Sequence, residues 1–258
     1  MNGFRTAMVV EARKATASST LRATGVLLAL GVPAIVAAIL AAAHGGGTPQ
    51  ARAQMLAKLG PEIAKADWHA LVLASTQVTA AASVFAFGLG AAWLVGREFA
   101  DGTAPALFGL PVSRPAIAAA KLVVHLCWAV IVSSVLAVTL ALVGLAFGLG
   151  VPGAEVVAGL VRIVVLGTLS ALIALAATVA ATLGRGILPG VAVAAVTIVV
   201  AQITVFTGAT AWVPLAAPAL WAMDPGAVSA GPLTLVVAFG AACAALTIAL
   251  WDRLQLVR

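Results

Sequence analysis

The chain has 258 residues, of which 63% are hydrophobic and only 9% charged, and its formal net charge is +6. A soluble domain carries about 25% charged residues, so this composition excludes an ordinary water-soluble globular protein. Several apolar runs reach about 20 residues, enough to cross a membrane as a helix. They lack the alternation of a transmembrane β-barrel. We therefore expect an all-α, polytopic membrane protein.

Residues 1–22 have the pattern of an amphipathic helix. Phe4 and Met8 recur on one side, whereas Arg5, Glu11 and Lys14 take the other. Such a helix lies in the membrane surface with its apolar side toward the lipid. A solvated tail is the alternative interpretation.

The first span is predicted at 24–43, with a kink at Pro33, which lacks a backbone donor. Residues 50–69 follow as an interfacial hairpin that Gly60-Pro61 divides into two short helices. Trp68 then stands where an aromatic anchor meets the headgroups.

The remaining spans are predicted at 70–96, 122–149, 156–183, 187–206 and 232–250. The segment 207–231 is rich in Pro and Trp and suggests an irregular interfacial loop or a re-entrant piece. Six spans place both termini on one side. We find no second domain, so residues 1–258 form a single membrane domain.

Basic residues are distributed unequally between the two sides of this topology. One side has Arg5, Arg13, Lys14, Arg22, Arg97, Arg114, Lys121, Arg185, Arg253 and Arg258, and the other has Arg52, Lys58, Lys65 and Arg162. Because cytoplasmic loops carry the excess of Lys and Arg, the richer side is predicted to be cytoplasmic. This bias explains the basic charge without a nucleic-acid partner. It places both termini and the polar segment 97–121 inside the cell.

Motifs of catalysis are missing from the sequence. There is no phosphate-binding loop of the Walker type, no metal-ligand spacing and no nucleophile motif, so the chain is not expected to be an enzyme or to hold a cofactor. His44, His69 and His125 are interpreted as interfacial residues. Arg162 is expected to extend to the outer surface, where Glu155 is a possible partner two turns away. Its alternative role is in ion coupling, which buried ionisable groups serve in transporters.

The segment 97–121 contains a recognisable group of residues. These are Glu98, Asp101, Gly102-Thr103, a Leu-rich stretch at 107–110, Pro111-Val112-Ser113-Arg114 and Lys121. They resemble the signature of ABC-2-type permeases, the transmembrane subunits of one class of ABC exporters. The amphipathic N-terminal helix, the six spans and the chain length are also similar to the family plan. Pro105 departs from it, because relatives more often carry a helix former there.

The resemblance implies a permease dimer on two copies of a separate cytoplasmic ATPase, which would bind ATP and magnesium. It makes 97–121 the coupling segment, with Glu98, Asp101, Gly102, Thr103, Pro111, Ser113, Arg114 and Lys121 as the coupling residues. On physical grounds, Glu98 and Asp101 are expected at a helix N-terminus, where they complement its dipole and can accept hydrogen bonds from the ATPase. Arg114 and Lys121 would bind the membrane surface or acidic groups of the partner. An ordinary charged loop is the alternative.

Polar residues within the spans suggest a substrate path. They are Ser75, Thr76, Gln77, Thr79, Gln202 and Thr204. Interhelical hydrogen bonding explains them equally well. We therefore expect a bacterial inner-membrane exporter subunit that works as a homodimer, in contact with membrane lipids and with an optional periplasmic accessory protein. Its substrate is a drug, a peptide or a lipid-like molecule. The alternatives are a membrane platform for metal or cofactor maturation and an independent secondary transporter.

Overall fold

The computed structural model describes residues 3–45, 48–107, 109, 111–207 and 211–255. Within these residues every regular element is helical. The helices are α1 (Gly3–Ala17), α2 (Ser19–Val26), α3 (Val32–Ala43), α4 (Pro49–Leu59), α5 (Trp68–Ala100), α6 (Ala104–Leu107), α7 (Arg114–Ala146), α8 (Ala154–Ala174), α9 (Ala176–Leu183), α10 (Ile187–Phe206), α11 (Ala217–Met223) and α12 (Ala230–Asp252). The predicted all-α class is confirmed.

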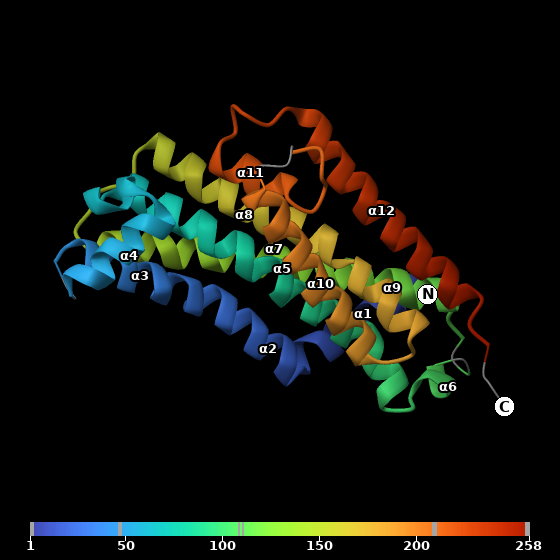
Figure 1. Cartoon of the computed structure of the whole chain (residues 1–258). Coiled ribbons are helices and arrows are strands. Elements are labelled where there is room, and N and C mark those ends of the chain that lie inside the picture. Colours follow the sequence, from blue (N-terminus) through green and yellow to red (C-terminus); the bar gives the residue numbers. More distant parts are fainter. Residues whose placement is uncertain (1–2, 46–47, 108, 110, 208–210, 256–258) are drawn as a thin grey trace.

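Six stretches of the described chain are long and apolar enough to cross a membrane: Ser19–Ala43, Trp68–Ala100, Arg114–Ala146, Ala154–Leu183, Ile187–Thr204 and Ala230–Asp252. They form one elongated bundle with both chain ends and α6 at the same end (Figure 1). We call this the base, and the other end, where α4 and α11 lie, the far end. The six predicted spans are thus confirmed. Arg258 and Leu110 lie outside the described residues.

Two spans are longer than the sequence indicates. Helices α5 and α7 each have 33 residues, so α5 continues to Ala100 and α7 already begins at Arg114. At 1.5 Å per residue, each is about 50 Å long and exceeds a hydrocarbon core of about 30 Å. The first and last turns of the predicted coupling segment therefore belong to these helices, and only residues 101–113 connect them.

The first span is interrupted by a π-helical turn at Leu27–Gly31, directly before α3. The ring of Pro33 would clash with the carbonyl group four residues earlier in a regular α-helix. The irregularity predicted at Pro33 is therefore present as this turn. The break at Gly60-Pro61 is also confirmed: α4 ends at Leu59, Gly60 has a φ of 97°, and a 3-10 helix follows at Pro61–Lys65.

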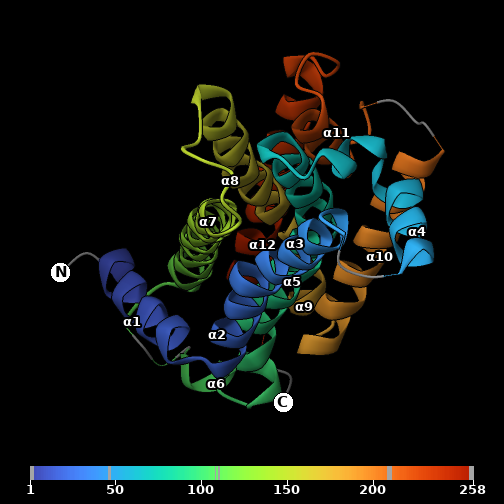
Figure 2. The same cartoon turned by 90° about the vertical axis from the view of Figure 1, so that its left-hand side faces the viewer.

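The core lies between the first span, α5, α7 and α8. Val36, Leu40, Leu71, Leu136 and Ile163 are all 0% exposed there. Figure 2 shows these helices nearly end-on, with α1 lying outside the bundle. Helix α1 packs against α7. The surface helix predicted at 1–22 is present over Gly3–Ala17 and is joined to the bundle, with Phe4 and Val10 among its exposed apolar residues. It is shorter than predicted, because residues 19–22 already belong to α2 and the first span.

Trp68 packs at the far end of α5 as the first residue of that helix. Its indole Nε1 donates a hydrogen bond to the Gly150 carbonyl at 3.3 Å. A Cβ at Gly144 would lie 2.2 Å from the indole ring, so this position of α7 has no room for a side chain. Trp68 thus joins α5 to the end of α7.

Two sequence-based expectations about side chains within the spans are wrong. His125 is 1% exposed and packs between Phe87 and Trp128 inside the bundle, rather than at the interface. Arg162 forms no ion pair with Glu155 within 4.0 Å, although both residues line one far-end cavity.

Candidate functional site

Four charged side chains meet at the base of the bundle. Lys121 Nζ lies 2.7 Å from Glu11 Oε2 and 2.7 Å from Glu98 Oε1. Lys14 Nζ lies 3.0 Å from Glu11 Oε1 and 2.8 Å from Glu98 Oε1. Each lysine contacts both glutamates, so the four charges form a closed ring. We call it the ion-pair ring.

The ring combines three parts of the chain that are distant in sequence. Glu11 and Lys14 are three residues apart and share one face of α1. Glu98 lies in the last turn of α5, and Lys121 lies in the third turn of α7. The ring therefore fastens α1 to the ends of both long helices.

Most of the ring is removed from solvent. The side chain of Lys121 is 1% exposed and those of both glutamates are 3% exposed, whereas Lys14 is 29% exposed. Buried charges are tolerated when each is paired and hydrogen-bonded, because an unpaired one costs several kcal/mol (about 3–5). Two cations and two anions make the ring neutral. The charges balance only while all four members are present.

Helix α12 closes the ring on a further side. The Trp251 ring lies 5.9 Å from Lys121 Nζ, which is within the range of a cation–π contact. Trp251 is 1% exposed, and its indole Nε1 donates to Thr182 Oγ1 at 3.2 Å. The base thus joins α1, α5, α7, α9 and α12.

Thr103 links the ring to the connecting segment 101–113. Its hydroxyl donates to Glu98 Oε2 at 2.6 Å, and its oxygen lies 3.3 Å from the Glu98 carbonyl oxygen. Burial alone would lower the pKa of Lys14, but its hydrogen bond to Glu98 and its attraction to Glu11 outweigh burial and raise that pKa above 10.5. Lys14 is therefore protonated across the physiological range.

The structure changes the expected placement of Glu98 and Lys121. Glu98 was expected at a helix N-terminus with its oxygens free for a partner. It lies instead at the C-terminal end of α5, and both of its oxygens already have partners in this chain. Lys121 is buried as well and does not reach the membrane surface. Direct docking by these two side chains is therefore excluded in this conformation.

Asp101 and Gly102 lie on the exposed surface of the base. Asp101 is the C-cap of α5, not an N-terminal residue, and its carboxylate lies 3.8 Å from Arg97 Nε. A carboxylate there opposes the helix dipole, which Arg97 offsets in part. Gly102 has a φ of 67°, a left-handed conformation that favours glycine.

The rest of the predicted coupling residues surround the start of α7. Ser113 is the extended N-cap residue of α7, and the Arg114 guanidinium donates to the Leu254 carbonyl. Pro111 borders a small apolar cavity against α1. Pro105 is the second residue of the four-residue helix α6, in the first turn, where proline is tolerated.

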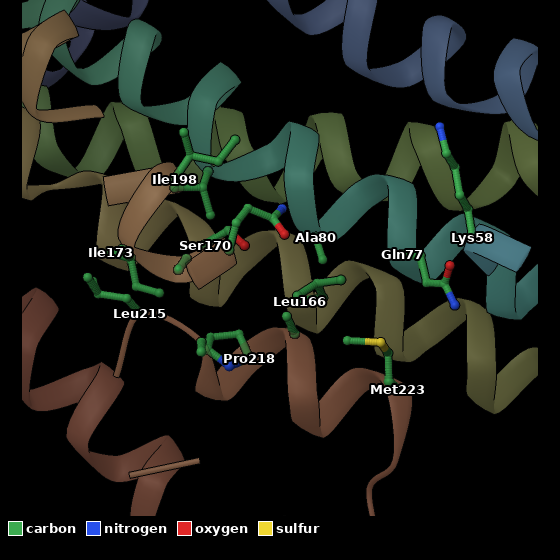
Figure 3. Close-up of a pocket in the computed structure, with 15 residues that line it drawn as sticks. Lys58, Gln77, Ala80, Leu166, Ser170, Ile173, Ile198, Leu215, Pro218 and Met223 are labelled. Carbon is green, nitrogen blue, oxygen red and sulfur yellow. The ribbon is translucent and has the colours of Figure 1, made fainter. Parts of the chain in front are cut away.

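A second candidate site is a cavity nearer the far end. A cavity of about 220 Å³ is enclosed by α5, α8, α10 and α11, and its lining includes Gln77, Gln202, Ser170 and Lys58. In Figure 3, Gln77 and Lys58 lie at one end of it, away from Ile198. Gln77 Nε2 donates to the Leu59 carbonyl at 3.3 Å. Two residues of the predicted substrate path are thus brought together.

The other members of that predicted path do not line this cavity. Ser75, Thr76 and Thr79 are 0%, 2% and 0% exposed, inside the bundle. Thr76 Oγ1 donates to the Val72 carbonyl, and Thr204 Oγ1 to the Val200 carbonyl. These two bonds each lie within one helix and account for Thr76 and Thr204 without a substrate. The buried hydroxyls of Ser75 and Thr79 have no hydrogen-bond partner among the described residues.

Sequence reasoning missed Glu11, Lys14 and Trp251 as members of the base. Glu11 and Lys14 were assigned to the water-facing side of α1. One signal was available: Glu98 and Lys121 are opposite charges beside apolar runs, and Glu11 with Lys14 repeats the same combination on one helix face.

An elongated bundle of six membrane-length helices, with a surface helix tied to its base by buried charges, defines a multi-pass membrane protein. The comparison with protein families identifies which one. The model described as ABC-2 family transporter protein matches residues 21–202, which is most of the chain. The chain belongs to this family, which confirms the family predicted from the sequence. No curated protein matches its sequence.

Membership has two direct consequences. The chain is a membrane permease component of an ABC transporter, and the family implies an ABC ATPase as its partner in general. Residues Glu11 and Lys14 lie before the matched region, and Trp251 lies after it. The ion-pair ring therefore joins the matched part of the chain to α1, and the contact of Trp251 with Lys121 joins it to α12.

Proposed function

We propose that the chain is the membrane-spanning subunit of an ATP-driven exporter in the bacterial plasma membrane. Two copies would stand on two copies of a cytoplasmic ATPase that binds ATP and magnesium. The base would face the cytoplasm, in keeping with the charge bias of the loops. Asp101, Gly102, Thr103, Pro111, Ser113 and Arg114 would form the surface that the ATPase pushes.

One observation carries the proposal: the ion-pair ring makes the exposed connection and the long helices one mechanical unit. Thr103 is bonded to Glu98, which in turn is bonded through Lys121 to α7 and through Lys14 to α1. A force on the connection would thus reach α5, α7 and α1 together. A surface loop that merely obeys the charge bias has no need of such bonds.

The best test of docking is Asp101, not Glu98. Reversal of Glu98 would place three cations around one carboxylate and break the ring. Its effect on ATPase docking could therefore not be separated from its effect on folding. The Asp101 side chain is 55% exposed, and its one ion pair among the described residues is a long contact to Arg97. We expect Asp101→Lys to lower co-purification of the partner ATPase, while the purified permease remains folded.

Glu62→Lys is the matched control. It makes the same charge reversal on a carboxylate that is 47% exposed and lies at the far end. Equal ATPase binding in wild type, Asp101→Lys and Glu62→Lys would contradict docking at the connection. In a variant without native cysteines, Asp101→Cys should react with an impermeant thiol reagent only from the cytoplasmic side.

For the cargo we propose an amphipathic or apolar molecule that passes the cavity lined by Gln77 and Gln202. That cavity has few polar groups, and apolar residues such as Leu166 and Ile173 make up most of its lining. Transport into inverted vesicles with the ATPase present tests export. ATP-dependent accumulation would support it. Binding of the ATPase without accumulation of any amphiphile would favour the membrane platform for maturation. Transport in the absence of the ATPase would favour the secondary transporter.

A further inference from the structure

A second cavity, of about 510 Å³, opens at the far end of the bundle between α5, α8 and the loop after α11. Trp68, His69, Glu155, Arg162 and Pro225 line it. It is separate from the cavity of Gln77 and Gln202, because the two share no lining residue. No step of the proposed coupling uses it.

Arg162 is the unusual member of this cavity. It belongs to a membrane-spanning helix, and its Nε atom is buried without a hydrogen-bond partner. Among the residues that the structure describes, it has no carboxylate within 4.0 Å. Ionisable groups at membrane depth are costly, and they are usually paired or functional. An acceptor from outside the chain would satisfy this donor.

Glu155 stands directly above Arg162 on the same face of α8. It lies in the first turn, and Arg162 follows seven residues later. Seven residues make nearly two turns, so the two side chains share one face about 10 Å apart along the axis. Glu155 also lacks an ion pair among the described residues. The cavity therefore presents an anionic group toward water and a cationic group deeper in the membrane.

This order matches one class of membrane molecule. A phospholipid with an amine headgroup has its ammonium outermost, its phosphate next and its acyl chains deepest. Guanidinium groups suit phosphate oxygens, because their N–H groups form charge-assisted hydrogen bonds. Below Arg162, Val165 is 37% exposed and continues the apolar surface that acyl chains need. Trp68 flanks the cavity at the depth of an interfacial aromatic residue.

We propose that this cavity binds one zwitterionic phospholipid with a primary amine, of the phosphatidylethanolamine type, in the leaflet at the far end. Arg162 donates to its phosphate, and Glu155 accepts from its ammonium group. Phosphatidylglycerol would also offer a phosphate to Arg162. Its headgroup carries no cation, so Glu155 would have no ion-pair partner. The site therefore selects for the amine.

Native mass spectrometry of the full chain, released from nanodiscs with equal phosphatidylethanolamine and phosphatidylglycerol, tests the proposal. We expect one tightly retained phosphatidylethanolamine per chain. Arg162→Gln should lower its retention about tenfold, the factor for one lost hydrogen bond between charged groups. Arg52→Gln is the matched control, because Arg52 is an exposed arginine on α4, also at the far end, that does not line the cavity.

Glu155→Gln tests the specificity separately and remains informative if Arg162→Gln does not fold. It should reduce the preference for phosphatidylethanolamine over phosphatidylglycerol about tenfold and leave phosphatidylglycerol retention unchanged. Equal retention in wild type and Arg162→Gln would overturn the proposal, as would an unchanged preference in Glu155→Gln. Displacement of the lipid by equimolar soluble glycerophosphoethanolamine would also overturn the proposal. It would show that the cavity binds a soluble phosphate ester rather than a lipid.

Discussion

Removal of Lys121 tests whether the ion-pair ring holds the base together. Lys121→Met replaces the cation by an apolar side chain of similar length and leaves Glu11 and Glu98 with only Lys14 between them. Both carboxylates are 3% exposed, so water cannot replace the lost partner. Breaking a buried pair from one side costs about 3–5 kcal/mol, and we expect a loss in that range.

The more exposed lysine should matter less. Lys14 is 29% exposed, and its removal leaves Lys121 in contact with both glutamates. Lys14→Met should therefore cost about 1 kcal/mol, near the upper value for partly solvated pairs. The exposed ion pair of Arg97 and Asp101 serves as the control. Asp101→Asn should change the free energy of unfolding by less than about 0.5 kcal/mol.

A double variant distinguishes lost pairing from poor packing of methionine. Glu98→Gln with Lys121→Met removes one charge of each sign, so the remaining pair of Glu11 and Lys14 stays neutral. The double variant should be less destabilised than the sum of the single ones by about 0.5–3 kcal/mol.

The free energy of unfolding can be measured by denaturant titration in mild detergent, with the fluorescence of the six tryptophans as the signal. Two results would refute the reasoning. One is a cost for Lys121→Met no larger than that for Lys14→Met. The other is full additivity of Glu98→Gln and Lys121→Met, which would show that the carboxylates do not depend on Lys121.

Three further predictions follow from contacts at the base and in the first span. Gly96→Ala should destabilise the protein by about 1–3 kcal/mol, because the new Cβ would lie 2.7 Å from the Gly186 carbonyl oxygen. A Cβ at Gly31 would have open space, so Gly31→Ala should not destabilise the protein; thermal unfolding of the two variants tests the difference. Thr103→Val should reduce ATPase stimulation by substrate more than it reduces permease stability, because its hydroxyl joins the partly solvated connection to the ring; a parallel loss of both would contradict this. The pKa of Lys14 is raised, so the stabilisation from its charge is fully present below pH 10.5 and is lost only as the pH rises through the higher pKa of the folded state. The difference in free energy of unfolding between wild type and Lys14→Gln should therefore be constant from about pH 6 to 9.

The sequence predicted most of the fold because the membrane imposes length and polarity on each span. Apolar runs of sufficient length, separated by Gly60-Pro61 and similar breaks, placed six helices correctly. The ends were less accurate, because a helix that leaves the hydrocarbon core can continue in water with polar residues. Helices α5 and α7 do this, so the turns that carry Glu98 and Lys121 looked like a loop.

The candidate site could be predicted only in part, because its chemistry depends on pairing between distant segments. Glu11 and Glu98 are far apart in the chain, and nothing local in either indicates that Lys121 lies between them. An amphipathic pattern assigns Glu11 to the polar side of α1 but does not reveal whether that side meets water or a buried lysine. Gln77 and Gln202 were correctly grouped as polar span residues, but only packing shows that they share a cavity and that Thr79 does not.

Helix α5 gives the proposed coupling its geometry. It carries Glu98 in the ion-pair ring and Gln77 in the cavity, 21 residues apart, which corresponds to about 30 Å of helix. No proline interrupts this helix, so α5 would carry a displacement at the base toward the cavity wall. The spans on either side have breaks, at the π-helical turn of Leu27–Gly31 and at Leu175 between α8 and α9. We infer that α5 transmits the movement and that these two breaks let the neighbouring spans accommodate it.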